Sequence, residues 1–372
     1  MKIGVPKEIK NHEYRVGMTP TSVREAVHHG HEVVVETNAG IGISGADDAY
    51  RAAGAAIVDT AEEVFATADM IVKVKEPQAV ERKMLREGQI LFTYLHLAPD
   101  PEQTKDLVDS GAVCIAYETV TDAHGGLPLL APMSQVAGRM SIQAGAHCLE
   151  RAQGGAGVLL AGVPGVRPAK VVVVGGGVVG ENAAYMAVGM GADVTILDRN
   201  VDTMRALVVR FGQSIKTLYS TRLTLEEETL AADLVIGAVL LPGAEAPKLI
   251  TRDLVSRMKT GSVICDVAID QGGCAETSKA TTHDDPTYVV DEVVHYCVAN
   301  MPGAVSHTST YALNNVTLPF TLAIADKGYK QALLDDPHLL AGLNVIEGKV
   351  TYEAVAHDLG YDFHAPETTL AA

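Results

Sequence analysis

The segment VVVVGGGVVG, at residues 171–180, constrains the fold more than any other part of the chain. Its glycines Gly175, Gly177 and Gly180 satisfy the pattern G-x-G-x-x-G between a run of valines and the helix-like stretch ENAAYMAVGMG. In such a unit the first glycine allows a tight turn, the second lets the backbone approach a pyrophosphate, and the third lets the helix pack on the sheet. The helix N-terminus then offers free N–H groups to the phosphates. The pattern predicts a dinucleotide-binding βαβ unit; the alternative is a glycine turn with a purely structural role.

Asp198 ends the strand-like run DVTILD that follows this helix, 198 − 180 = 18 residues beyond Gly180. An acidic side chain at this place hydrogen-bonds both ribose hydroxyls and repels a 2′-phosphate. Arg199, the next residue, would soften that repulsion. The sequence therefore predicts NAD as the cofactor in preference to NADP, and the alternative is an Asp that simply ends a strand.

Short runs rich in Val and Ile alternate with helix-length segments, which indicates βαβ units and mostly parallel sheets. In the first third of the chain we expect strands at residues 2–5, 32–36, 69–74, 89–95 and 112–118. A second series is expected at residues 170–177, 193–198, 215–220, 233–239, 262–270 and 295–303. Six strands in this rhythm are the full count of a doubly wound dinucleotide fold. We therefore expect an α/β protein with two doubly wound, Rossmann-like parallel-sheet domains and an active-site cleft between them.

A chain of 372 residues is long for a single core, so two domains are expected. Residues 129–152 predict a long helix, and after about residue 306 the chain is expected to be helical to its end. We predict a discontinuous substrate domain formed by residues 1–128 and 307–372. Residues 129–306 would form the NAD-binding domain.

The net charge of 29 − 46 = −17 argues against nucleic acid and anionic membranes as partners. No apolar run reaches the roughly 18 residues needed to span a bilayer. The five cysteines are odd in number and scattered, without a C-x-x-C pair, so we expect a reducing cytoplasm and no metal site.

Lys73 and Lys75 stand in the apolar run DMIVKVKEP, at residues 69–77. On a strand of period two they would share one face. Because a buried lysine is unfavourable unless it is paired, this face is either solvated or close to an anion. For Lys75 the structural alternative is a lysine that reaches solvent at the sheet edge, paired with Glu76.

Three further polar residues lie at or just beyond expected strand ends, where doubly wound sheets bind ligands. Arg15 suits a bidentate carboxylate, although an ion pair with Glu8 or Glu13 at the surface is the alternative. His96 follows an apolar run and titrates in the range useful for acid–base work, or it is a structural histidine. Asp270 precedes QGG and either faces the ligand or caps the turn. Together with Lys75 these residues suit a small oxo or amino acid facing a nicotinamide.

Over essentially its whole length the chain resembles the alanine dehydrogenase family. The motifs that carry the resemblance, besides the glycine loop, are GVPKEIKNHEYRVGMTP (4–20), KVKEP (73–77), LFTYLHLA (91–98), LPLLAPMSQVAGR (127–139), DVAIDQGG (266–273) and HYCVANMPGAV (295–305). Several of them are shared with the NAD-binding part of proton-translocating transhydrogenase. That family does not share a catalytic set equivalent to Arg15, Lys75, His96 and Asp270.

The resemblance implies an oxidoreductase that reversibly deaminates L-alanine with NAD to pyruvate, ammonia and NADH. It implies that Arg15 and Lys75 bind the substrate carboxylate, with Lys73 as support or solvated. Asp270 would stabilise an iminium intermediate, and His96 would deprotonate the attacking water. The implied cofactor contacts are Ser134, Gly175, Gly177, Val178, Val179, Gly180, Asp198, Ser220, Val239, Leu240, Val267, Ala268, Ile269, Asp270, Val298, Ala299, Asn300 and Met301. The family is typically a homohexamer or a related smaller oligomer.

Two departures from the family pattern stand out. Thr203 replaces a frequent Lys or Arg near the adenosine, which weakens that contact. Ser306 replaces a frequent Pro after MPGAV and is expected to loosen the return connection to the first domain.

Three other functions remain open on the sequence. The chain could be a transhydrogenase-like NAD-binding subunit with a membrane partner, or a sister dehydrogenase acting on glycine and glyoxylate or on a larger amino acid. It could also be an NAD-binding regulator with an inactive site, which the set of four polar residues argues against.

Overall fold

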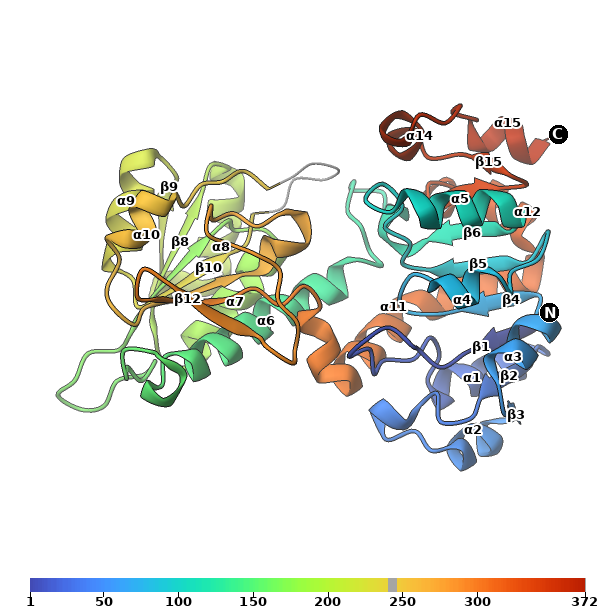
Figure 1. Ribbon diagram of the computed structural model, residues 1–372, viewed down its shortest axis with the longest axis horizontal. Coiled ribbons are helices and arrows are strands. Elements are labelled where there is room, and N and C mark those ends of the chain that lie inside the picture. The colour runs from blue at the N-terminus through green and yellow to red at the C-terminus, as the bar shows by residue number, and fades with distance from the viewer. Residues whose placement is uncertain (240–245, 372) are drawn as a thin grey trace. The chain divides into compact units, whose positions relative to one another are not determined.

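The computed structural model describes residues 1–239 and 246–371, which form two compact units (Figure 1). Unit 1 contains Met1–Met133 and Val305–Ala372, and unit 2 contains Ser134–Ala304. In Figure 1 the blue N-terminal part and the red C-terminal part of the chain therefore belong to one unit. The expected α/β class, with two doubly wound and mostly parallel sheets, is confirmed.

Unit 1 is built on an eight-stranded sheet with the order β15-β14-β6-β5-β4-β1-β2-β3. Its strands are β1 (Lys2–Val5), β2 (Glu32–Glu36), β3 (Ala56–Val58), β4 (Met70–Val72), β5 (Ile90–Thr93), β6 (Val113–Ala116), β14 (Leu343–Ile346) and β15 (Lys349–Val350). Strands β1 to β6 pair in parallel, whereas β14 is antiparallel to β6 and β15 is antiparallel to β14. The reversal of order on either side of β1 is the mark of a doubly wound sheet.

The helices of unit 1 connect and cover these strands. They are α1 (Pro20–His28), η1 (Ile41–Ile43), α2 (Asp47–Ala53), α3 (Ala61–Thr67), α4 (Ala79–Arg82), α5 (Pro101–Ser110), η2 (Tyr117–Thr119), α11 (Ser306–Lys327), α12 (Tyr329–Asp335), α13 (Pro337–Leu340), α14 (Glu353–Leu359) and α15 (Pro366–Ala371). Helix α1 begins where the Thr19 side chain accepts the N–H of Ser22, 3.2 Å away.

The expectation of a wholly helical C-terminal segment is wrong. Strands β14 and β15 form the hairpin LNVIEGKV, turning at Glu347, which has a φ of 50°, and Gly348. The hairpin lies beside β6 and extends the sheet made by the first third of the chain. Strand β3 and the antiparallel edge strand β12 of unit 2 were also missed. These two edge strands have only three and four residues and are not fully buried, so they lack the longer Val/Ile run of the central strands.

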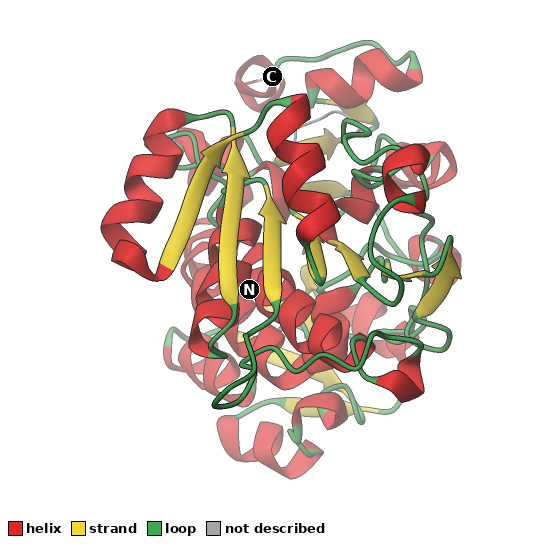
Figure 2. Cartoon of the chain, turned by 90° about the vertical axis from the view of Figure 1, so that its left-hand side faces the viewer, coloured by secondary structure: helices red, strands yellow, loops and turns green. Residues whose placement is uncertain are grey.

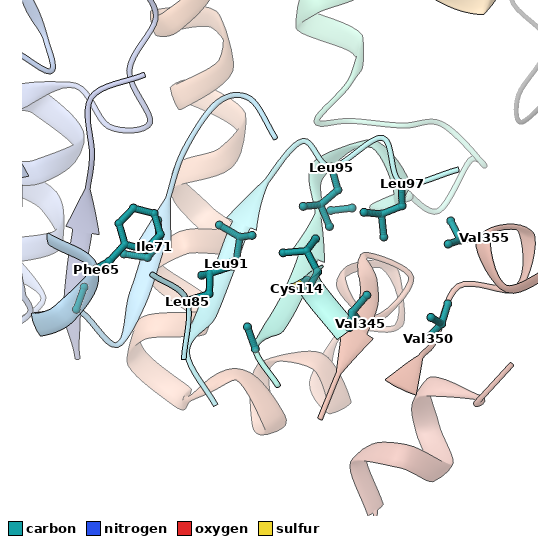
Figure 3. Packing of buried hydrophobic residues seen from close by; sticks show 14 of the residues in the cluster. Phe65, Ile71, Leu85, Leu91, Leu95, Leu97, Cys114, Val345, Val350 and Val355 are labelled. Carbon is teal, nitrogen blue, oxygen red and sulfur yellow. The ribbon is translucent and has the colours of Figure 1, made fainter. Parts of the chain in front are cut away.

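Side chains from both ends of the chain share the core of unit 1. Figure 3 shows Phe65, Ile71, Leu91 and Cys114 of the N-terminal segment in one buried cluster with Val345 of β14 and two nearby valines of the C-terminal segment. Burial of such side chains contributes roughly 1.5–3 kcal/mol each. The C-terminal segment is therefore an integral part of this core.

Unit 2 is built on a seven-stranded sheet with the order β12-β13-β11-β10-β7-β8-β9. Its strands are β7 (Lys170–Val174), β8 (Asp193–Asp198), β9 (Ile215–Tyr219), β10 (Leu234–Gly237), β11 (Val263–Asp266), β12 (Thr287–Val290) and β13 (Val293–Tyr296). All pair in parallel except β12, which is antiparallel to β13. The six parallel strands are those expected from the sequence, although β11 and β13 end earlier than predicted.

Helices lie on both sides of this sheet, as Figure 2 shows for its parallel strands. They are α6 (Ala131–Cys148, which starts in unit 1), η3 (Arg151–Gln153), α7 (Val178–Gly189), α8 (Val201–Phe211), η4 (Gly212–Ser214), α9 (Arg222–Ala231), α10 (Arg252–Ser256), η5 (Val267–Gln271) and η6 (Met301–Val305). Helix α6 approaches α7 closely, because a Cβ on Gly138 would meet the Val179 carbonyl oxygen at 2.2 Å. Within the described ranges, no helix combines the length and apolar character needed to cross a membrane.

Ser306 does not loosen the return to unit 1, contrary to expectation. It is the first residue of α11, and its Oγ donates to the Gly42 carbonyl oxygen at 2.6 Å. Gly42 belongs to η1, so this hydrogen bond ties the start of α11 to the N-terminal segment.

Candidate active site

Three neighbouring strands of unit 1, β1, β4 and β5, carry the candidate residues Arg15, Lys75 and His96 in the loops at their carboxyl ends. Strands β1, β4, β5 and β6 are adjacent and parallel, so these loops meet at one edge of the sheet. Arg15 follows β1, Lys75 follows β4, and His96 follows β5. The sheet order thus brings together residues that lie far apart in the sequence, at the edge where doubly wound folds bind ligands.

Arg15 is buried in a pair with Glu13. Its Nε and Nη2 donate to the two Glu13 carboxylate oxygens, both at 2.6 Å, and its Nη1 contacts Met133 Sδ at 3.0 Å. Burial alone would lower the pKa of Arg15, but the Glu13 carboxylate outweighs it and raises that pKa. The ion pair considered from sequence thus exists, but it is buried (2% exposure for Arg15). It also occupies one edge of the guanidinium fork that we expected a substrate to use.

Lys73 is fully buried, so the solvated alternative is wrong for this residue. Its Nζ donates to Glu81 at 2.7 Å and to Glu8 at 3.1 Å. Burial disfavours the ammonium ion, but the two carboxylates outweigh burial and raise the pKa of Lys73. Burial acts in the opposite direction on Glu8 and raises the pKa of that carboxyl, because Lys73 offsets only part of the desolvation.

Glu8 also fixes the backbone that carries Lys75. Its Oε1 accepts the N–H of Val74 at 2.7 Å and the N–H of Lys75 at 3.3 Å. On the other side, Thr93 Oγ1 donates to the Lys75 carbonyl oxygen at 3.0 Å. Lys75 itself is only half-buried, so the lysine pair divides into a buried structural member and an accessible member.

Glu76 carries charge beside Lys75. Burial raises the pKa of the Glu76 carboxyl, but Lys75 and Lys10 together outweigh it and lower that pKa. Lys10 also forms an ion pair with Glu76. The Lys75–Glu76 proximity considered from sequence is therefore present as an electrostatic interaction.

His96 is exposed, with 44% of its side chain accessible, and its backbone is left-handed with a φ of 51°. The ring stacks on Tyr94 with an interplanar angle of 6° and a centroid separation of 5.9 Å. Glu118, which follows β6, accepts the N–H of His96 at 2.6 Å. A left-handed backbone is unusual for a non-glycine residue and concentrates at functional sites.

In unit 2 the glycine loop joins β7 to α7 with the geometry that a dinucleotide needs. Gly175 has a φ of 102°, and a Cβ on Gly180 would lie 1.9 Å from the Gly175 carbonyl oxygen. Both positions therefore require glycine. A Cβ on Gly177 would meet no protein atom within 4 Å, so the backbone there borders open space. Gly177 is also the N-cap of α7, whose first amides, those of Val178 and Val179, begin the helix.

Asp198 ends β8 and holds the glycine loop. Its two carboxylate oxygens accept the N–H of Gly176 at 2.6 Å and the N–H of Asn200 at 2.7 Å. Each carboxylate oxygen has a second lone pair, so acceptor capacity remains for a ribose hydroxyl. Thr203 lies close to the loop, with its Cγ2 3.1 Å from where a Cβ on Gly176 would stand.

Asp270 lies in the 3₁₀ helix η5 and not at the end of a strand, because β11 ends at Asp266. The Asp266 carboxylate stops the strand: it is fully buried and accepts the N–H of Cys274 at 2.7 Å and the hydroxyl of Ser278 at 2.6 Å. Lys248 Nζ donates to the carbonyl oxygen of Gly273 at 2.9 Å. The loop that presents the exposed Asp270 is thus fixed at both of its ends.

The remaining cofactor candidates, apart from Ser134 on α6, follow strands of the same sheet. Ser220 follows β9, Val239 follows β10, and Val267 to Ile269 share η5 with Asp270. Val298 to Met301 follow β13; Val298 and Met301 are buried, and Ala299 and Asn300 are half-buried. Leu240 lies outside the described residues.

Sequence reasoning missed the acidic residues that support the candidates, namely Glu8 and Glu13 as buried partners, Glu81, Glu118 and Asp266. The signal available in the sequence was a carboxylate at the end of an expected strand, which singled out Asp198 at the end of 193–198 and was equally present at the end of 112–118. It was not applied to Glu118.

Taken together, the two sheets and the glycine loop define a doubly wound protein of the dinucleotide-binding class. Family models for the alanine dehydrogenase/PNT N-terminal domain and C-terminal domain match residues 4–137 and 141–353. The chain belongs to this alanine dehydrogenase/PNT family.

Individual relatives are similar over their full length. The alanine dehydrogenase of Halomonas elongata is 62% identical over 363 residues, covering 98% of each chain, and that of Bacillus subtilis is 56% identical, covering 100% of this chain and 98% of the relative. A solved L-alanine dehydrogenase superimposes with a TM-score of 0.94 at 53% identity, covering 97% of this chain and 99% of the other. The transhydrogenase of Sinorhizobium meliloti superimposes with a TM-score of 0.81 at 26% identity, covering 95% and 100%.

Proposed function

We propose that the protein is an NAD-dependent L-alanine dehydrogenase, which reversibly converts L-alanine to pyruvate and ammonia. The observation that carries the proposal is the edge of the unit 1 sheet, where Arg15, Lys75 and His96 follow adjacent parallel strands. Two cations and an imidazole suit a small 2-oxo or 2-amino acid. The full-length identity to alanine dehydrogenases supports the choice of alanine over glycine and glyoxylate or larger amino acids.

NAD would be held by unit 2. The open space at Gly177 and the first amides of α7 fit a pyrophosphate, and the carboxylate of Asp198 fits the ribose hydroxyls. The further residues proposed to line this site are Ser134, Ser220, Val239, Leu240, Val267 to Asp270, and Val298 to Met301. When bound, NAD supplies the acceptor for the hydride that leaves the alanine Cα.

The substrate carboxylate would bind Lys75 and Arg15. The buried Lys73, paired with Glu8 and Glu81, would support this pocket from within.

Loss of hydride from Cα leaves an iminium on the substrate. Asp270 would stabilise that cation and orient the amine. His96 would take the proton of the water that attacks the iminium carbon and then return it to the departing ammonia. In the reverse direction His96 would polarise the pyruvate carbonyl while ammonia adds.

The cellular setting is part of the proposal. The chain would act in the cytoplasm on L-alanine, pyruvate and ammonia, as a homohexamer. Analytical ultracentrifugation of the purified protein would test the hexamer, and a particle of any other size would contradict it.

The test of the reaction is NADH absorbance with pyruvate, ammonia and purified protein, repeated with NADPH and with glyoxylate. Oxidation of NADH that requires both pyruvate and ammonia supports the proposal. NADH binding without turnover would refute it and favour a transhydrogenase-like or regulatory role, and faster turnover with glyoxylate would favour the sister activity.

A further inference from the structure

We propose that Glu118 is a positioning residue for His96. Its carboxylate holds the His96 backbone in the left-handed conformation that presents the imidazole to the substrate. The assignment rests on the proposed function in one respect, since it takes His96 as the acid–base group. Nothing in the sequence motifs pointed to Glu118, which lies 22 residues beyond His96 and just after β6, the strand next to β5.

The carboxylate of Glu118 accepts hydrogen bonds from two consecutive backbone amides. Its Oε1 accepts the N–H of His96 at 2.6 Å and the N–H of Leu95 at 3.1 Å, and its Oε2 lies 3.2 Å from the same Leu95 nitrogen. Successive amides of extended backbone point in opposite directions, so both can face one carboxylate only where the chain turns. The two amides flank the Cα of Leu95, so the turn falls there, and Glu118 fixes the peptide group between Leu95 and His96, whose orientation sets the His96 φ of 51°.

This conformation needs a partner to persist. A non-glycine residue in the left-handed region is strained unless its surroundings determine it. Without an acceptor at Glu118, the two N–H groups would lose their hydrogen bonds in this conformation. They would regain hydrogen bonds by rotating toward water. The backbone would then return to the extended region and carry the Cα–Cβ bond of His96 to a new direction.

The hydrogen bonds of Glu118 go to the backbone and not to the ring. His96 Nδ1 lies 3.9 Å from Glu118 Oε1, which is beyond hydrogen-bonding distance. The ring is instead placed by Tyr94, on which it stacks. Tyr94 is itself fixed, because its hydroxyl donates to the Leu129 carbonyl oxygen at 2.6 Å and its ring meets Tyr117 edge-on at 5.1 Å.

Tyr117 and Glu118 are neighbours in η2, the short 3₁₀ helix that follows β6. One supports the aromatic platform below the imidazole, and the other holds the backbone that bears the imidazole. The helix η2 therefore supports His96 through both residues. Groups that hold a catalytic side chain in place affect the rate strongly, because small misplacements lower the population of reactive geometry.

The test compares two variants of the intact enzyme. Glu118→Ala removes the acceptor and should lower kcat about 10- to 100-fold, with the KM for pyruvate and the Kd for NADH changed by less than about threefold. Glu118→Gln keeps an acceptor oxygen and should restore kcat to within about threefold of wild type. An unchanged kcat in Glu118→Ala, or an equal loss in Glu118→Gln, would overturn the proposal.

Asp47 offers a matched control in the same unit. Its carboxylate accepts the N–H of Asn38 at 2.8 Å, and Asn38 is likewise a non-glycine residue with a positive φ, 61°. Asp47→Ala therefore removes an equivalent carboxylate–amide hydrogen bond from a residue outside the candidate site. Its kcat should equal that of wild type, and a loss as large as that of Glu118→Ala would mean that general loosening of the unit explains both results.

A readout independent of activity separates this proposal from the proposed function. Crystal structures of the two variants should show His96 outside the left-handed region in Glu118→Ala and inside it in Glu118→Gln. If His96 kept its left-handed φ in Glu118→Ala, the proposed role of Glu118 would be wrong, whatever the activity of the variant. If wild-type protein fails to oxidise NADH with pyruvate and ammonia, the proposed function fails while the comparison of φ still decides the role of Glu118.

Discussion

The two units provide positive groups for an anionic ligand in different ways, each at the carboxyl-end edge of its sheet. Unit 1 places charged side chains there, and it buries Lys73 and Arg15 against carboxylates such as Glu13. Unit 2 offers backbone amides, from the glycine loop and the start of α7, in a region where a Cβ on Gly177 would meet nothing. A buried ion network needs partners from several strands, whereas a helix start needs only a short run of sequence.

The difference matters for what each unit can bind. Backbone amides form a fixed cradle for phosphates, which every dinucleotide presents in the same form. Side chains can be exchanged one at a time, so the side-chain site is the place where selectivity for one small acid can be built. The four predictions below test this contrast, from the largest expected effect to the smallest.

Replacing His96 should give the largest effect. We expect His96→Ala to lower kcat by about 10²- to 10⁴-fold, the range typical of a lost acid–base group. NADH binding, measured by fluorescence titration, should not change, because the proposed cofactor residues lie in unit 2. The control is His357→Ala, since His357 is 87% exposed on α14. A His96→Ala enzyme with wild-type kcat would remove the imidazole from the chemistry.

Replacing Lys73 should test the buried network. Lys73→Met leaves the carboxylates of Glu8 and Glu81 without their shared cation and should destabilise the protein by about 3–5 kcal/mol. The matched control is Lys105→Met, which removes the exposed pair with Asp109 and should leave the free energy of unfolding close to that of wild type. Urea denaturation measures both. Similar values for the two variants would mean that burial of the Lys73 network has little energetic weight.

Two glycines of the same loop should behave differently. Gly180→Ala forces a Cβ to within 1.9 Å of the Gly175 carbonyl oxygen, so we expect it to lower the melting temperature and to abolish NADH binding. Gly177→Ala meets no protein atom, so its melting temperature should stay within about 1–2 °C of wild type while NADH binding weakens. Calorimetry and titration of both variants test the pair. Unchanged NADH affinity in Gly177→Ala would argue against a pyrophosphate beside that residue.

The smallest effect should be the pH dependence due to Glu76. Lys75 and Lys10 hold the pKa of the folded protein's Glu76 carboxyl below its ordinary value of 4.5, despite the opposing effect of burial. A depressed carboxyl pKa stabilises the fold above pH 4.5, and this contribution is lost as the pH falls through the folded-state pKa. The difference in unfolding free energy between wild type and Glu76→Gln should therefore shrink below pH 4.5. A difference that grows on acidification would reverse the assigned sign.

The same contrast between backbone amides and side chains explains how well each site could be predicted from the sequence. The glycine loop was read from ten residues because G-x-G-x-x-G encodes its geometry locally, and the structure gives Gly175 and Gly180 reasons to be glycine. The position of Asp198 at the end of β8 was read equally well. Arg15, Lys75 and His96 were placed near strand ends by position and given roles by family resemblance. Those roles remain predictions.

The partners of these residues could not be read from the sequence. Whether Lys73 is solvated or buried depends on Glu8 and Glu81, and a strand pattern does not reveal which loop folds over it. The hairpin of β14 and β15 was missed because its pairing with β6 joins residues that are more than 200 positions apart. Likewise, β11 was predicted too long because the apolar run resumes after Asp266, and the sequence does not show that this carboxylate accepts the N–H of Cys274 and ends the strand.

The split of unit 1 between the two ends of the chain has a consequence for synthesis on the ribosome. Strand β6 leaves the ribosome with its outer edge unpaired, and its neighbour β14 is made only after all of unit 2, which contributes 304 − 133 = 171 residues. At about 5–20 residues per second, this interval lasts roughly 9–34 s. During that time unit 2 can complete its own fold, while the first six strands of unit 1 wait with an open edge to which another strand could add. The order of the segments thus allows the inserted unit to fold before unit 1 is complete, and β14 and β15 complete the sheet of unit 1 only afterwards.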